Sequence, residues 1–203
     1  MKPKLSPTNR DILRSLLCSR GEEAQYLRDC AARTSEELFG RAIFLRGLIE
    51  TSSYCRNNCY YCGLRASNSS AERYRLSHTE ILECCQTGYD LGLRTFVLQG
   101  GEDGTHTDSW LVDLVSTIRN QYPDVAITLS LGERSEESYR RLRDAGANRY
   151  LLRHEAANDN LYASLHPGSR GLQHRLECID ALKRCGYQVG MGMMIGVKGQ
   201  SLE

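Results

Sequence analysis

Three times along this chain, a segment with helical periodicity ends at a glycine and an apolar segment begins within four residues. The glycines are Gly92, Gly146 and Gly186, and glycine is the residue that most often terminates a helix. The segments that follow are apolar almost throughout, which is typical of strands buried on both faces. Helices that alternate with such strands predict βαβ units built around a parallel sheet.

The chain holds five predicted strands with four predicted helices between them. The strands are expected within residues 41–53, 95–99, 125–132, 148–155 and 187–196, and the helices within 77–91, 108–122, 136–145 and 172–185. Polar and glycine-rich stretches, ETSSYC, QGGED, SLGE and RHE, stand where strands end. Functional groups at the carboxyl ends of several strands are typical of (βα) barrels. An α/β fold with a TIM-type barrel is therefore favoured over an open doubly wound sheet.

The two ends of the chain differ in pattern. Residues 1–40 have apolar residues at helical spacing and predict an N-terminal helical extension. A complete eight-unit barrel needs about 250 residues, and residues 41–203 hold about five units by the same estimate. The sequence therefore predicts that residues 41–203 are the N-terminal portion of a barrel, a partial barrel truncated at its C-terminus.

Charge and hydropathy exclude several classes of protein. The net charge is +1, with 26 basic and 25 acidic residues and no long block of one sign, so no nucleic-acid-binding surface is expected. No apolar run approaches the roughly 18 residues of a membrane span. The first 20 residues lack the apolar region of a signal peptide. These features predict a cytoplasmic protein without a membrane or nucleic-acid partner.

Nine cysteines are present, an odd number in a chain with no sign of secretion. Thiols stay reduced in the cytosol, so disulfides do not explain them. Six of them lie in helix-like segments and are expected to act as small buried apolar residues: Cys18, Cys30, Cys84, Cys85, Cys178 and Cys185. The other three, Cys55, Cys59 and Cys62, lie together in YCRNNCYYCG.

The spacing of Cys55, Cys59 and Cys62 restricts the metal that they can hold. Thiolates select zinc, copper(I) or iron–sulfur clusters, and structural zinc requires four ligands. A cubane iron–sulfur cluster takes one thiolate for each iron, so three cysteines leave one iron free to bind a small molecule. Zinc with a distant fourth ligand, or thiols without any metal, remain alternatives.

The CxxxCxxC spacing, with Tyr61 directly before the last cysteine, resembles the signature of the radical S-adenosylmethionine (SAM) enzymes. The resemblance implies a barrel that carries this loop after its first strand, with a [4Fe-4S] cluster on Cys55, Cys59 and Cys62 and SAM as the second cofactor. Such enzymes cleave SAM reductively to methionine and a 5′-deoxyadenosyl radical. The backbone of Tyr61 is expected to meet the adenine of SAM.

The later strand ends supply further cofactor-binding candidates by the same resemblance. Gly100 and Gly101 are expected to hold the amino group of SAM, although Gly-Gly is also common in turns. Glu155 is expected at the ribose hydroxyls with Arg153 beside it; alternatively the two form an ion pair at the barrel mouth. Arg175 is suited to a bidentate grip on the methionine carboxylate, or is a surface arginine.

The whole set of motifs resembles one family within the superfamily. CxxxCxYCGLR, ERYRLS, VLQGGED, TLSLGE, RYLLRHEAAN and MIGVKGQS together resemble the maturase of [FeFe]-hydrogenases, within the group that includes biotin synthase and methylornithine synthase. The chain departs from that family at His166, where an arginine is common, and at Lys198, where a proline is common.

The resemblance implies substrate and partners as well. An organometallic iron complex is the expected substrate, with Ser130 and Glu133 as candidates for its pocket, although Glu133 could simply begin a helix. Ferredoxin or flavodoxin is expected as electron donor, other hydrogenase maturases as possible partners, and anaerobic conditions for activity. The alternatives are a radical enzyme acting on a small amino acid, an inactive cluster-binding fragment, and a zinc-binding module.

Overall fold

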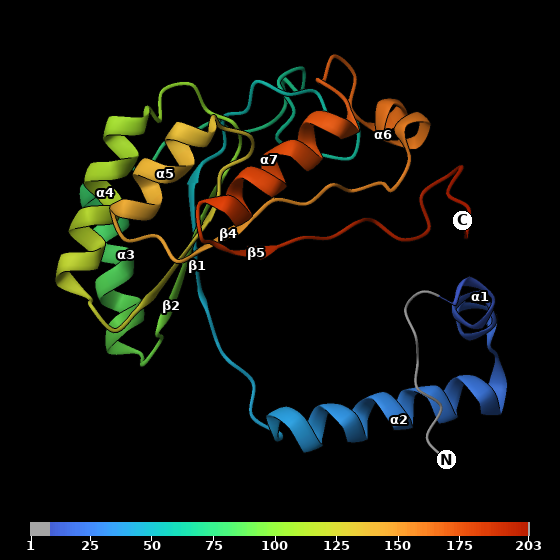
Figure 1. Ribbon diagram of the computed structural model, residues 1–203. Helices are drawn as coiled ribbons and strands as arrows, with labels where there is room; N and C mark the ends of the chain where they lie inside the picture. The colour runs from blue at the N-terminus through green and yellow to red at the C-terminus, as the bar shows by residue number, and fades with distance from the viewer. Residues whose placement is uncertain (1–8, 203) are drawn as a thin grey trace. The chain divides into compact units, whose positions relative to one another are not determined.

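The computed structural model describes residues 9–202, which form two compact units. The first unit runs to Phe44 and includes the residues from Ser201 onward. It contains α1 (Arg10–Cys18) and α2 (Gly21–Phe39), both visible in Figure 1. The Asn9 side chain caps α1 by accepting a hydrogen bond of 3.1 Å from the Ile12 N–H. The N-terminal helices expected from the sequence are confirmed.

The second unit, Leu45–Gln200, is built on a five-stranded sheet. Its strands are β1 (Gly47–Ser52), β2 (Thr95–Gly100), β3 (Ala126–Ser130), β4 (Arg149–Leu151) and β5 (Gln188–Gly190). All neighbours pair in parallel, in the order β1-β2-β3-β4-β5. A parallel sheet in strict sequence order is the arrangement of consecutive (βα) barrel units, so the predicted partial barrel is confirmed.

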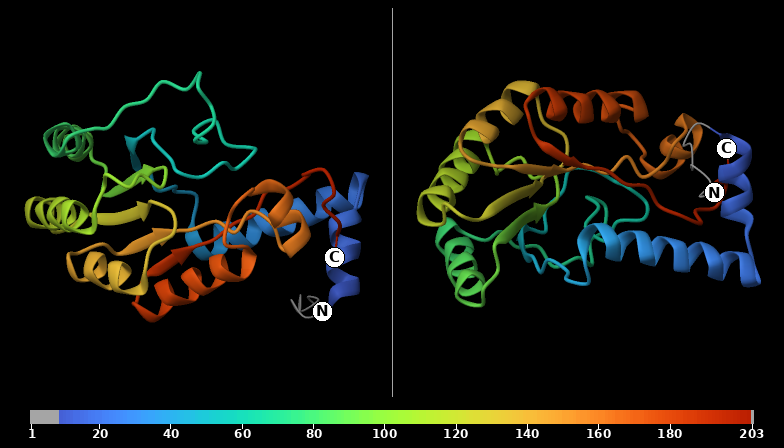
Figure 2. Two further views of the ribbon diagram at one scale, coloured as in Figure 1. Left: turned by 90° about the horizontal axis from the view of Figure 1, so that it is seen from above. Right: turned by 60° about the horizontal axis from the view of Figure 1, so that its bottom comes forward.

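The helices of this unit are α3 (His78–Asp90), α4 (Asp108–Gln121), α5 (Glu136–Asp144), α6 (Asp159–Leu165) and α7 (Leu172–Arg184). All but α6, which packs on α7, cover one face of the sheet. Figure 2 shows α3, α4, α5 and α7 side by side along the outer face of the curved sheet. The core lies between these helices and the strands, where Phe96, Ile127 and Tyr150 are fully buried.

Glycines end α3, α5 and α7 as the sequence predicts. Gly92, Gly146 and Gly186 have φ values of 86°, 119° and 80°, in a region that favours residues without a Cβ. The capping box at Ser77 and Glu80 is also present, with both side-chain-to-backbone hydrogen bonds formed.

Three features differ from the sequence prediction. β1 begins at Gly47 rather than near Arg41, because its ladder with β2 starts at the pair Gly47 and Phe96. The fourth and fifth strands are only three residues long. The short helix α6 was not predicted; its seven residues are too few for a clear periodicity, and it depends on a cap from the Asn158 side chain to the Leu161 N–H.

Within residues 9–202, none of the helices combines the length and the apolar character needed to cross a membrane.

Candidate functional site

The three clustered cysteines lie on the loop that leaves β1 at the carboxyl end of the sheet. All three are free thiols of intermediate exposure. The Cys62 N–H donates to the Cys59 carbonyl at 3.0 Å, and the Asn57 N–H donates to the Cys55 sulfur at 3.4 Å. Burial raises the pKa of the Cys59 thiol, and its neighbours Cys55 and Cys62 raise it further. The three sulfur atoms therefore interact electrostatically across one loop.

This donor set fits an iron–sulfur cluster better than a single zinc ion. The loop offers three free thiols, one fewer than the four ligands of a structural zinc site. A cubane binds each thiolate through a different iron. Cys55, Cys59 and Cys62 are accordingly the residues that would hold the cluster.

Arg73 organises the return half of the cysteine loop. Its guanidinium donates to the carbonyls of Leu64 at 2.9 Å, Arg65 at 2.8 Å and Asn68 at 3.2 Å, and also to the Ser53 carbonyl. A planar group with five donors can satisfy four carbonyls at once. Arg73 therefore joins the end of β1 to the segment that follows Cys62.

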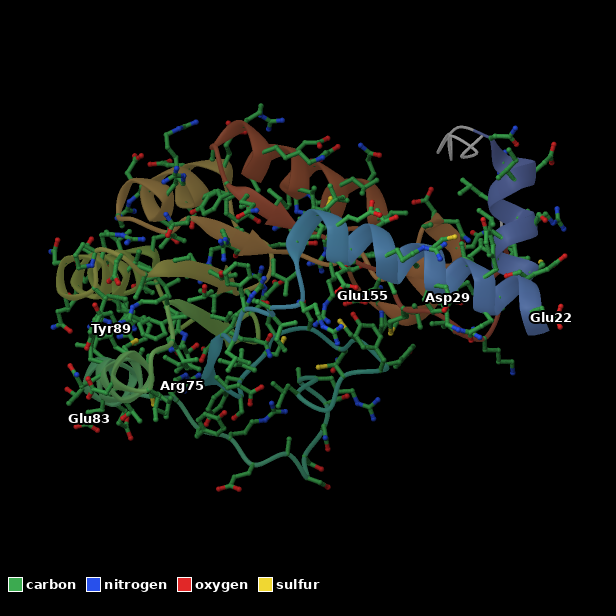
Figure 3. All side chains as sticks on the ribbon, turned by 90° about the horizontal axis from the view of Figure 1, so that it is seen from below. Glu22, Asp29, Arg75, Glu83, Tyr89 and Glu155 are labelled. Carbon is green, nitrogen blue, oxygen red and sulfur yellow. The ribbon has the colours of Figure 1, made fainter. Side chains whose placement is uncertain are left out.

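A second arginine from the ERYRLS segment fixes the start of the loop. Arg75 donates to both carboxylate oxygens of Asp103, at 2.6 and 3.0 Å, and stacks on the Tyr54 ring at 3.6 Å. The Ser52 hydroxyl donates to the same carboxylate at 2.6 Å. Burial opposes ionisation of Asp103, but these hydrogen bonds outweigh it and hold the pKa below its usual value. Figure 3 labels Arg75.

Glu102 connects the cysteine loop to the loop after β3. Its side chain is 8% exposed and accepts two hydrogen bonds from Arg56, at 3.0 and 2.8 Å. The other oxygen accepts from the Glu133 N–H at 2.9 Å. Gly132, at φ 76°, passes so close that a Cβ there would overlap the Glu102 side chain. Glu102 and Asp103 are thus buried structural carboxylates.

Gly100 and Gly101 lie where β2 meets the cysteine loop. A Cβ on Gly101 would come within 2.5 Å of the Cys55 Cβ and would overlap the Tyr54 carbonyl. A Cβ on Gly100 would lie 3.1 Å from the Thr51 hydroxyl oxygen. The absence of a side chain at Gly101 therefore lets the cysteine loop pack directly on the end of β2.

Arg153 and Glu155 face one another after β4, with 3.3 Å between Arg153 Nε and Glu155 Oε1. Glu155 has φ 61°, a conformation that non-glycine residues seldom adopt. Hydrogen bonds fix this backbone, from the Glu155 N–H to the Gly192 carbonyl at 3.1 Å and from the Met194 N–H to the Glu155 carbonyl at 3.0 Å. Backbone strain of this kind is common at binding sites. The Glu155 side chain is 12% exposed.

Arg175 and Glu133 form a half-buried ion pair. Arg175 Nε lies 2.8 Å from Glu133 Oε1 and 3.3 Å from the Tyr162 hydroxyl, and the two side chains are only 12% and 15% exposed. Arg175 and Glu133 also line a cavity of about 270 Å³ together with Cys59. The structure therefore brings a predicted cluster ligand, a predicted cofactor-binding residue and a predicted substrate-pocket residue into one space. Ser130, the other candidate for the substrate pocket, ends β3 beside Gln99.

Tyr61 is anchored by a residue far away in the sequence. Its hydroxyl lies 2.8 Å from Nε2 of His166, and Nδ1 of His166 lies 2.8 Å from the Tyr162 carbonyl. A carbonyl can only accept, so Nδ1 carries the hydrogen. Burial lowers the pKa of His166 and favours the neutral ring, whose Nε2 then accepts the Tyr61 hydroxyl hydrogen. The residue that departs from the family pattern thus holds the aromatic residue beside the cysteines.

Sequence reasoning missed several of these contributors. Arg73, Arg75, Glu102 and Asp103 position the loop but carry no metal-ligand or catalytic pattern of their own. These four residues lie in the ERYRLS and GGED segments, which belong to the motifs that carry the resemblance. No role was assigned to these four residues from the sequence.

Comparison with known proteins agrees with this site. The sequence profile described as the radical SAM superfamily matches residues 49–203. This chain belongs to the radical SAM superfamily. The match includes the end of β1, the cysteine loop and all later strands, so the predicted superfamily membership is confirmed.

Two curated relatives match most of this chain. The [FeFe] hydrogenase maturase subunit HydE of Thermotoga maritima is 43% identical over 164 residues, covering 81% of this chain and 46% of the relative. The 3-methylornithine synthase of Methanosarcina acetivorans is 31% identical over 196 residues, covering 95% and 55%. This radical SAM chain therefore spans about half the length of the curated relatives that it matches.

A solved structure shows the same fold. The crystal structure of methylornithine synthase (PylB) matches with a TM-score of 0.88 and 28% identity, covering 95% of this chain and 57% of that one. The agreement over nearly the whole chain supports the arrangement of the sheet, the cysteine loop and the helices of this radical SAM protein.

Proposed function

We propose that this chain binds a [4Fe-4S] cluster and SAM and acts, within a radical SAM enzyme, in maturation of the [FeFe]-hydrogenase active site. The observation that carries the proposal is the 43% identity to a hydrogenase maturase across 81% of the chain. The cysteine loop supports it, because three half-buried free thiols lie beside a cavity lined by Cys59, Glu133 and Arg175.

Cys55, Cys59 and Cys62 would hold the cluster, which when bound would supply the one-electron reduction needed to cleave SAM to methionine and a 5′-deoxyadenosyl radical. The protein's own residues position and shield the reactants. Arg175 would hold the methionine carboxylate through its terminal guanidinium nitrogens, since its Nε already contacts Glu133 and Tyr162. Glu155, with Arg153 beside it, would hold the ribose hydroxyls. Tyr61, fixed by His166, would present its backbone to the adenine.

The substrate that follows from this proposal is an organometallic iron complex, and Ser130 and Glu133 are proposed to line its pocket. Ferredoxin or flavodoxin would deliver the electron, and other hydrogenase maturases would exchange substrate or product. Low-potential clusters with an exposed iron are sensitive to oxygen, so anaerobic conditions are proposed for the activity.

The test is anaerobic reconstitution of the chain with iron and sulfide, followed by incubation with reductant and SAM. We expect an iron–sulfur chromophore and release of 5′-deoxyadenosine. Cys59→Ala should lose the chromophore and the product, while Cys84→Ala, an exposed cysteine outside the loop, should keep both. A fully loaded cluster without 5′-deoxyadenosine would refute activity of this chain. Retained iron in Cys59→Ala would refute the ligand assignment.

A second candidate is a radical enzyme acting on a small amino acid. The TM-score of 0.88 to methylornithine synthase supports it. Incubation of the reconstituted protein with lysine separates the two: an isomerised amino acid favours this candidate, and SAM cleavage without one favours the maturase.

A further inference from the structure

Glu133, His174 and Cys178 bring three different metal-binding groups together from two parts of the fold. His174 and Cys178 lie four residues apart on α7 and so share one face of the helix. Glu133 reaches them from the loop between β3 and α5. The carboxylate, imidazole and thiol ligand atoms all lie within 4.8 Å of one another. The cysteine loop takes no part in this group.

The distances agree with the edges of a tetrahedral metal site. His174 Nε2 lies 3.4 Å from Glu133 Oε2 and 3.7 Å from Cys178 Sγ. Zinc bonds of about 2.3 Å to sulfur and about 2.0–2.1 Å to nitrogen and oxygen, at tetrahedral angles, give edges of about 3.6 Å between nitrogen and sulfur and about 3.3 Å between nitrogen and oxygen. The two edges that involve His174 therefore match that geometry, and the third, between Glu133 and Cys178, is at most 4.8 Å.

The hydrogen bonding around His174 leaves Nε2 as the ligand atom. Arg170 Nη1 lies 3.4 Å from Nε2, and since a guanidinium can only donate, Nε2 accepts this hydrogen bond through the lone pair that a metal ion would use. Nδ1 faces Glu177 Oε2 at 3.9 Å. A carboxylate on the far side of an imidazole is the usual outer partner of a metal-bound histidine. Arg170 is exposed and can turn aside for a cation.

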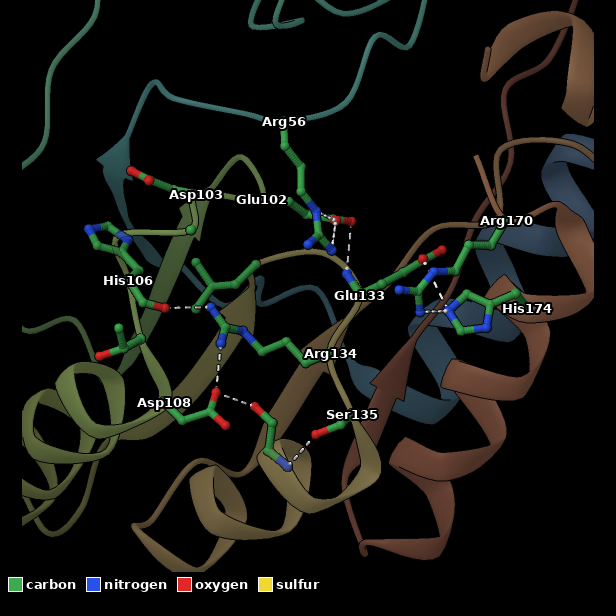
Figure 4. Close-up of a pocket in the computed structure, with 14 residues that line it drawn as sticks. Arg56, Glu102, Asp103, His106, Asp108, Glu133, Arg134, Ser135, Arg170 and His174 are labelled. Atoms are coloured by element: carbon green, nitrogen blue, oxygen red, sulfur yellow. Dashed lines mark hydrogen bonds and ion pairs between the residues drawn. The ribbon is translucent and has the colours of Figure 1, made fainter. Parts of the chain in front are cut away.

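One carboxylate oxygen of Glu133 and an adjoining cavity are available to a single divalent ion. Arg175 contacts Oε1 of Glu133 and leaves Oε2 facing His174. Glu133 and His174 line a cavity of about 460 Å³ (Figure 4), while Cys178 is buried. An ion held by three protein ligands would therefore keep a fourth position open toward this cavity, as in zinc sites that bind a water or substrate.

We propose that Glu133, His174 and Cys178 bind one divalent transition-metal ion of the zinc type, at a site separate from the iron–sulfur loop. The mixed nitrogen, sulfur and oxygen donors suit Zn²⁺ and Co²⁺. Binding releases the Cys178 thiol proton to solvent and involves no change of oxidation state. None of the three ligands is a cysteine of the iron–sulfur loop, and Glu133 would be shared with the Arg175 ion pair at the proposed SAM site.

The experiment uses the full chain with Cys55, Cys59 and Cys62 replaced by serine, so that the loop cannot compete for metal. Anaerobic titration with Co²⁺ should reach one equivalent and develop thiolate-to-cobalt charge-transfer absorption, which Zn²⁺ then bleaches by displacement. In this background Cys178→Ser should abolish the charge-transfer band. His174→Gln should weaken binding by at least about tenfold.

Cys185→Ser is the matched control, because Cys185 is a half-buried thiol at the C-cap of the same helix whose sulfur lies 3.7 Å from the Glu136 carbonyl. It should leave the titration unchanged. His174 is 28% exposed, so His174→Gln tests the site even if replacing buried Cys178 perturbs folding. The proposal would be overturned if the variant with three loop serines showed no charge-transfer band. It would also be overturned if adding His174→Gln to that variant left the cobalt titration unchanged.

Discussion

Arg75 clamps Asp103 with two hydrogen bonds, from Nε to Oδ2 at 2.6 Å and from Nη2 to Oδ1 at 3.0 Å. The Asp103 side chain is 3% exposed, and the Ser52 hydroxyl also donates to it. This carboxylate therefore joins the end of β1, the end of β2 and the segment before α3. The cysteine loop starts from that junction.

Asp103→Asn should destabilise the protein by about 1.5–3 kcal/mol, because it weakens buried hydrogen bonds to a charged group. The folded-state pKa of Asp103 lies below its unfolded value of about 3.9. Its contribution is therefore complete above roughly pH 5 and is lost as the pH falls below about 4. Urea unfolding at pH 7 and near pH 3 measures both effects. Asp124→Asn, in the exposed pair with Arg94, is the control and should cost under about 1 kcal/mol; equal losses would contradict the assignment.

Arg73→Lys should loosen the cysteine loop. A lysine ammonium cannot span the four carbonyls that the guanidinium satisfies. We expect faster proteolytic cleavage between Cys62 and Tyr74 and less iron incorporated on reconstitution. Arg65→Lys is the control, because Arg65 makes one long contact of 3.3 Å from Nη1 to the Tyr60 carbonyl. Identical cleavage rates in the two variants would show that Arg73 does not order the loop.

Tyr61 and His166 should be energetically coupled. Tyr61→Phe removes the donor and His166→Leu removes the acceptor of the 2.8 Å hydrogen bond. Each single change leaves a polar partner unsatisfied, so a double-mutant cycle of unfolding free energies should give a coupling of about 0.5–1.5 kcal/mol. Strictly additive values would mean that the hydrogen bond does not form in solution.

Glu155→Gly and Glu155→Ala should differ in stability although both remove the carboxylate. Glycine adopts φ 61° without a steric penalty, whereas alanine has a Cβ and retains the steric cost of this conformation. Glu155→Gly should therefore unfold at a higher temperature, with a difference of about 1 kcal/mol. Calorimetry measures it. If the alanine variant is equally stable, the backbone at this position is not strained. On the proposed function, both variants should also lose affinity for SAM.

Much of the fold follows from short-range patterns in the sequence. The helix-ending glycines at Gly92, Gly146 and Gly186 and the capping box at Ser77 depend on residues within a few positions, and the structure contains all of them. The start of β1 was predicted too early, because the pairing with β2 sets where the strand begins. That pairing starts at Gly47 opposite Phe96, a residue far along the chain that no local pattern connects to Gly47. The short helix α6 gave too little periodicity to detect.

The sequence alone determined the order of the strands and of the longer helices and the single loop with three cysteines, because these depend on local periodicity and spacing. The tertiary structure decided which distant side chains meet. Tyr61 reaches His166 across 105 positions, Arg75 reaches Asp103 across 28, and Glu133 reaches Arg175 and His174. Such contacts depend on the register of the sheet and on the packing of the helices, which bring the strand ends together. Neither can be predicted from a local sequence pattern.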